Sequence, residues 1–163
     1  MARIDVDQDT VLTRLVAHLQ STLSLNARQC FPVVDPDQPP ELPVGGTFFV
    51  GVGVAEGQLF PDEQISGNIS EDSDVEVTGY SRIHLDSADH DEKLYQETNR
   101  GTLILKKKLI KAVAGVDLTT AGGDNFLRQP MYVKRASRTQ YDGDQMIAWI
   151  TITIGVDFDW DIT

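Results

Sequence analysis

Hydrophobic and polar residues alternate with a period of two in several stretches of the chain, and this pattern predicts β-strands. The stretches are residues 47–54, 74–85, 130–138 and 146–158. An Asp-Gly pair, Asp142 and Gly143, separates the last two stretches, and such a pair predicts a tight hairpin turn. The C-terminal half of the chain should therefore end in a β-hairpin.

Glycines occupy alternate positions in the first predicted strand. Gly51 and Gly53 face one way, opposite a row of valines. A strand face without side chains allows another segment to approach the backbone closely. No helix follows this Gly-x-Gly pair, so it does not match a dinucleotide-binding fingerprint. We expect close packing on the glycine face.

Two stretches carry apolar residues at helical spacing. The first covers residues 9–23, and its stripe consists of Leu12, Leu15, Val16, Leu19 and Leu23. The second covers residues 89–115, where the stripe runs from Leu94 to Ala112 across Gly101. Glycine inside a helix costs about 1 kcal/mol relative to alanine, which leaves a break at Gly101 open.

Two long connections complete the pattern. Residues 31–46 carry five of the seven prolines, which predicts an extended loop. Residues 55–73 are expected to form an acidic loop, in which residues 65–69 could add a short strand. The elements then follow the order α-β-β-α-β-β within a single domain of residues 1–163. The predicted fold class is α+β, with an antiparallel or mixed sheet and both helices packed on one face.

The net charge of −11 limits the partners that the chain can have. An acidic surface repels nucleic acid and anionic membranes, so we expect no specific nucleic-acid binding and no membrane partner. No apolar run approaches the roughly 18 residues that span a bilayer. The polar start lacks a signal-peptide core, and Cys30 is the single cysteine, so we expect synthesis in a reducing cytoplasm.

The charge is unevenly distributed along the chain. Residues 100–138 hold nine basic and two acidic residues, a net of +7, whereas the remainder holds five basic and 23 acidic residues, a net of −18. Unlike surfaces on two copies could then meet head to tail. The candidate self-association surface consists of Lys106, Lys107, Lys108, Lys111, Arg135, Arg138, Asp157, Asp159 and Asp161. The alternative is that both sets of charges are solvated faces.

Metal-ligating residue types gather in one segment. Its members are His84, Asp86, Asp89, His90 and Asp91. Their spacing matches no closed metal motif, and carboxylates at a helix start are also expected as caps. The series at Asp157, Asp159 and Asp161 lacks the glycine and glutamate of a calcium loop. No Gly-x-Ser-x-Gly motif is present. We therefore assign no catalytic, cofactor or metal residues.

The order of elements resembles that of the tail-terminator and head–tail neck proteins of long-tailed bacteriophages. The matching segments are residues 11–23, 47–54, 74–85, 91–113 and 131–158. The resemblance implies a non-enzymatic virion protein that forms a ring, usually of six copies, and binds tail-tube or neck proteins. Residues 55–73 depart from this pattern, being longer and more acidic than expected between the first two strands.

Two other functions remain open at this point. One is a metal-dependent or small-ligand enzyme that uses the segment from His84 to Asp91. The other is a cytoplasmic adaptor protein of the same fold class.

Overall fold

The computed structural model describes residues 6–61, 68–86 and 88–161. These residues form three helices and six strands. The elements are α1 (Gln8–Leu23), β1 (Cys30–Pro32), β2 (Phe49–Pro61), β3 (Asn68–Arg82), α2 (Glu92–Gln96), α3 (Thr102–Val113), β4 (Tyr132–Ala136), β5 (Gln140–Asp142) and β6 (Ile147–Asp161). The helices of this part of the chain are too short or too polar to cross a membrane.

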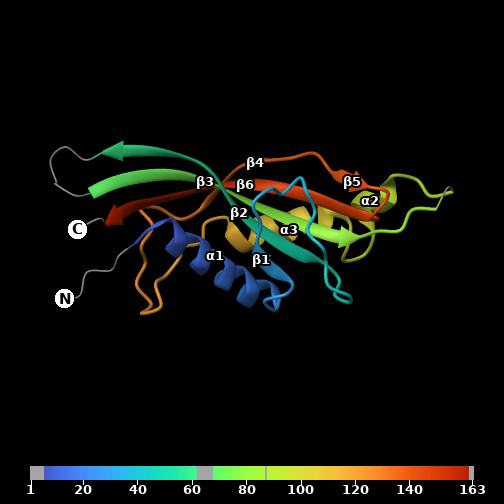
Figure 1. The fold of residues 1–163 in the computed structure, drawn as a ribbon, viewed down its shortest axis with the longest axis horizontal. Helices are drawn as coiled ribbons and strands as arrows, with labels where there is room; N and C mark the ends of the chain where they lie inside the picture. The colour runs from blue at the N-terminus through green and yellow to red at the C-terminus, as the bar shows by residue number, and fades with distance from the viewer. Residues whose placement is uncertain (1–5, 62–67, 87, 162–163) are drawn as a thin grey trace.

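The strands form one mixed sheet in the order β1-β2-β3-β6-β4, with β5 also paired to β6 (Figure 1). β1 is parallel to β2, and the other pairs are antiparallel. The predicted α+β class with a mixed sheet is confirmed. β1 and β5 are additions to the predicted order, and both are only three residues long.

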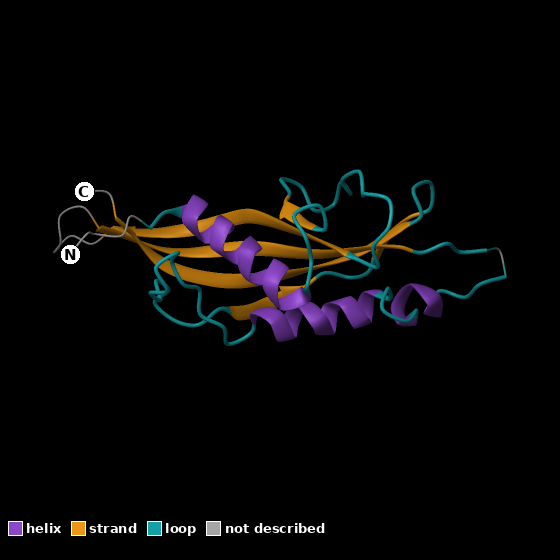
Figure 2. Ribbon diagram, turned by 90° about the horizontal axis from the view of Figure 1, so that it is seen from below, coloured by secondary structure: helices purple, strands orange, loops and turns teal. Residues whose placement is uncertain are grey.

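The helices pack on one side of the sheet, as predicted (Figure 2). α1 buries Leu15 and Leu19 in the same core cluster as Ile152 and Ile154 of β6. Gly79 leaves room for α3, because a Cβ there would lie 3.2 Å from Leu105. We call this side of the sheet the helix face and the opposite side the open face. Each strand contributes alternate residues to the two faces.

The carboxylate of Asp7 caps the start of α1. It accepts hydrogen bonds from the backbone N–H of Thr10 at 2.7 Å and from its hydroxyl at 2.9 Å. Such a cap satisfies a donor that has no partner within the first turn. The cluster of polar residues at this position in the sequence therefore marks the start of the helix.

The predicted acidic loop at residues 55–73 is wrong for its described part. β2 and β3 stay paired from Gly57 opposite Ser73 to Pro61 opposite Ile69, and β6 runs beside β3 to Asp161. These three strand ends extend beyond the helices as an arm (Figures 1 and 2). Acidic side chains replace the hydrophobic ones here because the arm has little core to face. Residues 62–67, which join β2 to β3, lie outside the described residues.

The predicted helix over residues 89–115 is two helices instead of one. α2 ends at Gln96, a turn follows, and α3 begins at Thr102. Asn99 in this turn has a φ of 62°, a left-handed conformation that ends a helix. The break occurs where Gly101 interrupts the stripe.

The Pro-rich segment crosses the open face as a strap, which we define as residues 33–46. The phenol of Tyr80 donates to the carbonyl of Pro36 at 3.0 Å, and Arg82 donates to the carbonyl of Leu42 at 2.6 Å. A Cβ at Gly51 would lie 2.9 Å from the Val33 side chain. The expected close packing on the glycine face is confirmed, and the strap provides it. Directly before the strap, Cys30–Pro32 form the short strand β1 beside β2.

Replacing Gly53 with alanine is expected to displace the strap. The new Cβ would lie 2.8 Å from the carbonyl oxygen of Val33, so the backbone has to move. We expect a loss of about 1–3 kcal/mol in the free energy of unfolding, measured by urea denaturation. The exposed Gly143→Ala, whose Cβ meets its nearest neighbour at 3.9 Å, is the control. Equal stability of the two variants would contradict this packing.

Candidate assembly surface

The open face divides into a covered half and a charged half. Near Tyr80 and Trp149 the strap covers the sheet, and Leu42 is buried there. Toward the arm, a hollow of about 270 Å³ is lined by Glu56, Gly57, Gln58, Asp72, Asp74, Tyr132 and Lys134. This charged half is the part of the open face that a partner could reach.

Basic residues of the +7 stretch meet acidic residues within the same chain on this face. Lys134 Nζ lies 2.7 Å from Asp74 Oδ1, and Arg135 lies 3.9 Å from the same carboxylate. Arg128 pairs with Asp72 and lies 3.3 Å from Asp159. These residues are at least partly exposed, where an ion pair contributes about 0–1 kcal/mol. Three of the nine basic residues of this stretch are therefore paired with acids inside one copy.

Asp157 does not belong to an exposed acidic surface. Its side chain is buried, and its carboxylate accepts hydrogen bonds from Gln129 and from Tyr132. Burial and the Asp157 carboxylate together raise the pKa of Tyr132. Asp159 is exposed but already bonded to Arg128 and to Ser70. Asp161 ends β6, and its side chain lies outside the described residues.

The lysines of α3 occupy a different surface, on the helix side of the molecule. Lys107 and Lys111 are exposed, and Lys106 and Lys108 are half-buried. Lys108 Nζ lies 5.5 Å from the centre of the Phe48 ring, a cation–π contact. Within the described part of the chain, no carboxylate lies within 4.0 Å of these lysines. The structure does not bring them together with Arg135, Arg138, Asp157 and Asp159, which belong to the other side.

The sequence prediction missed Asp72 and Asp74, the two acids that organise the charged half. Asp72 fell in the predicted acidic loop, and Asp74 was the first residue of the predicted strand over residues 74–85. Ser70, Asp72 and Asp74 continue the polar side of the alternation found from residue 74 onward. Glu71 and Ser73 between them are polar as well, so no hydrophobic alternation marks this part of the chain as a strand.

Glu71 is the unusual acid of the arm, because it points to the helix face and is only 5% exposed. Its Oε2 has no hydrogen-bond partner in the described structure. Burial raises the pKa of this carboxyl, and the nearby Trp160 indole offsets only part of the effect. A buried charge without a partner destabilises the fold in its ionised form.

Glu71→Gln is expected to raise the unfolding temperature at neutral pH. The folded pKa of Glu71 lies above its unfolded value, so the folded state binds more protons between the two values. The native protein therefore loses stability as pH rises through that window, and the variant does not. The advantage should vanish below about pH 4, the ordinary carboxyl range. Calorimetry against pH tests this, with the exposed Glu56→Gln as control. A constant advantage at all pH values would contradict it.

The segment from His84 to Asp91 forms pairwise contacts. His84 Nε2 lies 2.7 Å from Asp86, and Asp89 accepts from the backbone N–H of Asp86 at 2.8 Å. Asp91 stands at the N-cap of α2, but its side chain makes no capping hydrogen bond, contrary to expectation. The described residues contain no group of three potential ligands. Asp89 therefore shapes the turn, and this segment supplies no observation that favours a metal-dependent reaction.

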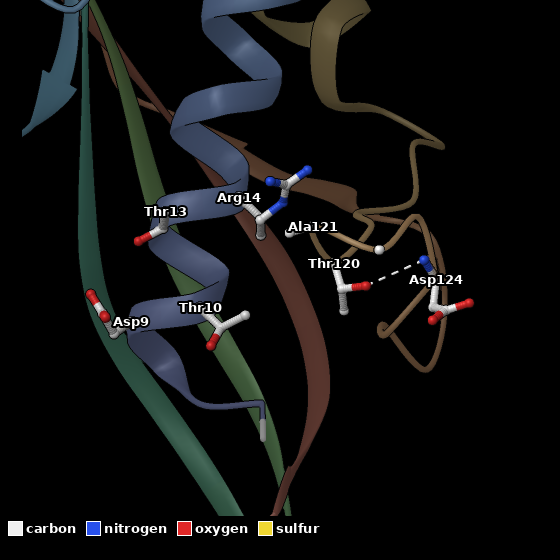
Figure 3. A pocket seen from close by; sticks show the side chains of 8 residues that line it. Asp9, Thr10, Thr13, Arg14, Thr120, Ala121 and Asp124 are labelled. Atoms are coloured by element: carbon white, nitrogen blue, oxygen red, sulfur yellow. Dashed lines mark hydrogen bonds between the residues drawn. The ribbon is translucent and has the colours of Figure 1, made fainter. Parts of the chain in front are cut away.

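A second hollow, of about 490 Å³, lies between the first turns of α1 and the loop before β4 (Figure 3). Its lining consists of Asp9, Thr10, Thr13, Arg14, Thr120, Ala121, Gly122 and Asp124. Arg14 donates to the carbonyl of Thr119 at 2.6 Å, and Thr120 accepts from the Asp124 backbone N–H at 3.3 Å. Among these residues no hydroxyl is paired with a histidine or a lysine.

Comparison with known proteins gives one informative result. No family model and no curated protein matches the chain. Among solved structures, a chain described as "Virion of native gene transfer agent (GTA) particle" matches with a TM-score of 0.52 and 10% sequence identity. The match covers 93% of this chain and 96% of that chain. The two chains share a fold over nearly their whole length.

Proposed function

We propose that this protein is a structural component of a phage or prophage virion, of the tail-terminator or head–tail joining type. The observation that carries the proposal is the near full-length fold match to a chain of a gene transfer agent virion. The order of elements that resembles tail-terminator proteins supports the same role. Assembly in place of catalysis also fits the charged and open surfaces described above.

In this role the chain would form a homo-oligomeric ring, with six copies as the expected number, and would bind tail-tube or neck proteins. It would be made in the bacterial cytoplasm and act in the tail or neck of the particle. The net charge of −11 suits a ring through which DNA passes, because an acidic lumen does not retain phosphates. The exposed lysines of α3 remain available for an acidic neighbour.

Size-exclusion chromatography with light scattering, followed by electron microscopy, tests the proposal. We expect rings, either from the purified chain alone or after addition of tail tubes from the same particle. A chain that stays monomeric and also fails to bind tail tubes would rule out this function. A ring without tail-tube binding would retain self-assembly but exclude the terminator role.

A charge reversal on α3 tests the candidate surface directly. Lys107→Glu is expected to shift the oligomer toward monomer, because it places like charges at a contact that favours a basic residue. Arg28→Glu makes the same change of charge at another exposed position and is the control. Light scattering at equal concentrations compares the two. Equal dissociation of both variants would exclude a specific role for α3.

A further inference from the structure

The sheet leaves part of β2 unpaired on its outer side. β1 pairs with β2 only from Cys30 opposite Val50 to Pro32 opposite Val52, and the Val33 N–H then donates to the Val52 carbonyl. From Gly57 to Pro61, β2 pairs with β3 on one side, Ala55 and Glu56 lie in an irregularity of this pairing, and no described strand lies on the other side of β2. We call residues 55–61 the arm edge. Its backbone groups are free to pair with another strand.

The side chains of the arm edge are unusually open for a strand. Residues 56–60 are all exposed, and they include two large apolar side chains, Leu59 at 53% and Phe60 at 42% exposure. Proteins normally protect such an edge with lysine, proline or a covering loop, and among residues 55–61 only the last, Pro61, is of these types. The irregular pairing between Val54 and Gly57 lies at the base of the arm, and pairing is regular beyond it. The arm edge has the features of a strand that is covered in an assembly.

A second free edge lies at the opposite side of the sheet. β4 pairs with β6, and no described strand occupies its other side. The Met131 N–H donates to the Val116 carbonyl, but Met131 precedes the start of β4. Tyr132, Arg135 and Ala136 are exposed. β4 could therefore pair with another strand over about 16 Å, given a rise of roughly 3.3 Å per residue.

Charge decides which edges meet. Residues 55–61 and 68–76 contain five acids and no base, whereas residues 128–138 contain four bases and no acid. The arm edge itself contributes one acid, Glu56, so two arm edges facing each other would bring no basic residue to it, whereas β4 offers bases. In the described structure, Glu56 and Arg138 have no ion-pair partner within 4.0 Å and are free to meet across copies.

We propose that the arm edge of one copy pairs with β4 of a second copy, so that the sheet continues from subunit to subunit. The contact joins unlike surfaces and therefore builds a ring or a filament instead of a closed pair. This inference rests on the self-assembly in the proposed function and assigns the strands that carry it. Backbone hydrogen bonds supply much of the affinity in strand addition, and side chains select the partner.

Disulfide trapping tests the contact. The native Cys30 does not interfere, because it is buried and burial raises the pKa of its thiol to about 12. Gln58→Cys and Arg135→Cys introduce exposed thiols at the two edges, both on the open face of the sheet. Within one chain these edges are separated by β3 and β6, about 14 Å at ordinary strand spacing, which is too far for a disulfide.

We expect a disulfide-linked dimer when Gln58→Cys is mixed with Arg135→Cys under mild oxidation, and a ladder of multimers from the double variant. Each single variant alone should stay uncrosslinked, as should Gln58→Cys mixed with the control Arg28→Cys. A Gln58→Cys homodimer, or equal crosslinking with Arg28→Cys, would overturn the pairing. Oligomers by light scattering without the mixed dimer would reject this contact and keep self-assembly. A monomer without crosslinks would overturn this inference, whereas the proposed function fails only if tail tubes are not bound either.

Discussion

Replacing Gly101 with alanine is expected to destabilise the protein by about 3 kcal/mol, at the upper end of the usual cost of overpacking. A Cβ at this position would lie 2.2 Å from the carbonyl oxygen of Tyr95 and 2.5 Å from its carbonyl carbon. Both atoms are backbone, so no side-chain rotation relieves the contact. Gly101 is buried and has a non-helical ψ of 142°, so alanine gains no helix propensity there.

The displacement would reach beyond the turn between α2 and α3. The Gly101 N–H donates to the carbonyl of Glu97 at 2.7 Å, and Ser81 of β3 donates to the carbonyl of Arg100 at 2.6 Å. Moving this turn therefore breaks its attachment to the sheet. Urea denaturation measures the loss. Gly122→Ala, whose Cβ would meet its nearest neighbour at 3.7 Å, is the control and should change stability by less than about 0.5 kcal/mol. Unchanged stability of Gly101→Ala would indicate one continuous helix.

In residues 89–115 the helical spacing of apolar residues predicts which side chains are buried better than it predicts where the helices begin and end. Leu94, Leu105, Leu109 and Ala112 belong to the predicted stripe, and all four are buried. They are nevertheless divided between two helices, because a stripe records which residues face the core and not whether the backbone is continuous. α1 and β6 were predictable because their apolar periods run without interruption over 15 residues or so.

The sequence pattern failed where strands have little core to face. The arm carries acids at Glu71, Asp72 and Asp74, and its pairing depends on backbone hydrogen bonds to β2 and β6. Such strands lack the hydrophobic alternation that identifies a half-buried strand. β1 was missed for another reason: three residues that include Pro32 are too few to show a period.

The candidate site shows a similar limit. Counting charges along the chain identified a basic and an acidic portion, but the count does not tell which charges meet within one copy. Folding pairs Arg128, Lys134 and Arg135 with acids of β3, which leaves the α3 lysines, Arg100 and Arg138 without an acidic partner within the described residues. Free strand edges depend on sheet order, and strand order is not contained in a local pattern.

Phe158→Ala is expected to lower the free energy of unfolding by about 3–5 kcal/mol, the usual cost of removing a buried aromatic ring. Phe158 is fully buried in the main core, at the point of the arm where β6 pairs with Glu71, and its ring centre lies 5.9 Å from that of Trp160. The cavity would open where β6 leaves the body of the protein. Urea denaturation measures the loss, and hydrogen exchange should show faster exchange in the arm.

Phe60→Ala is the matched control, because it removes the same ring from an exposed position of the same arm. The free energy of unfolding of this variant should change by less than about 0.5 kcal/mol. Comparing the two variants thus separates an effect on folding from an effect on assembly. Phe158 holds the arm to the core of its own copy, whereas Phe60 lies on the edge that we assign to a neighbour. Equal losses of stability in both variants would mean that the arm packs on its own copy through both rings, and the edge would then be unavailable to a partner.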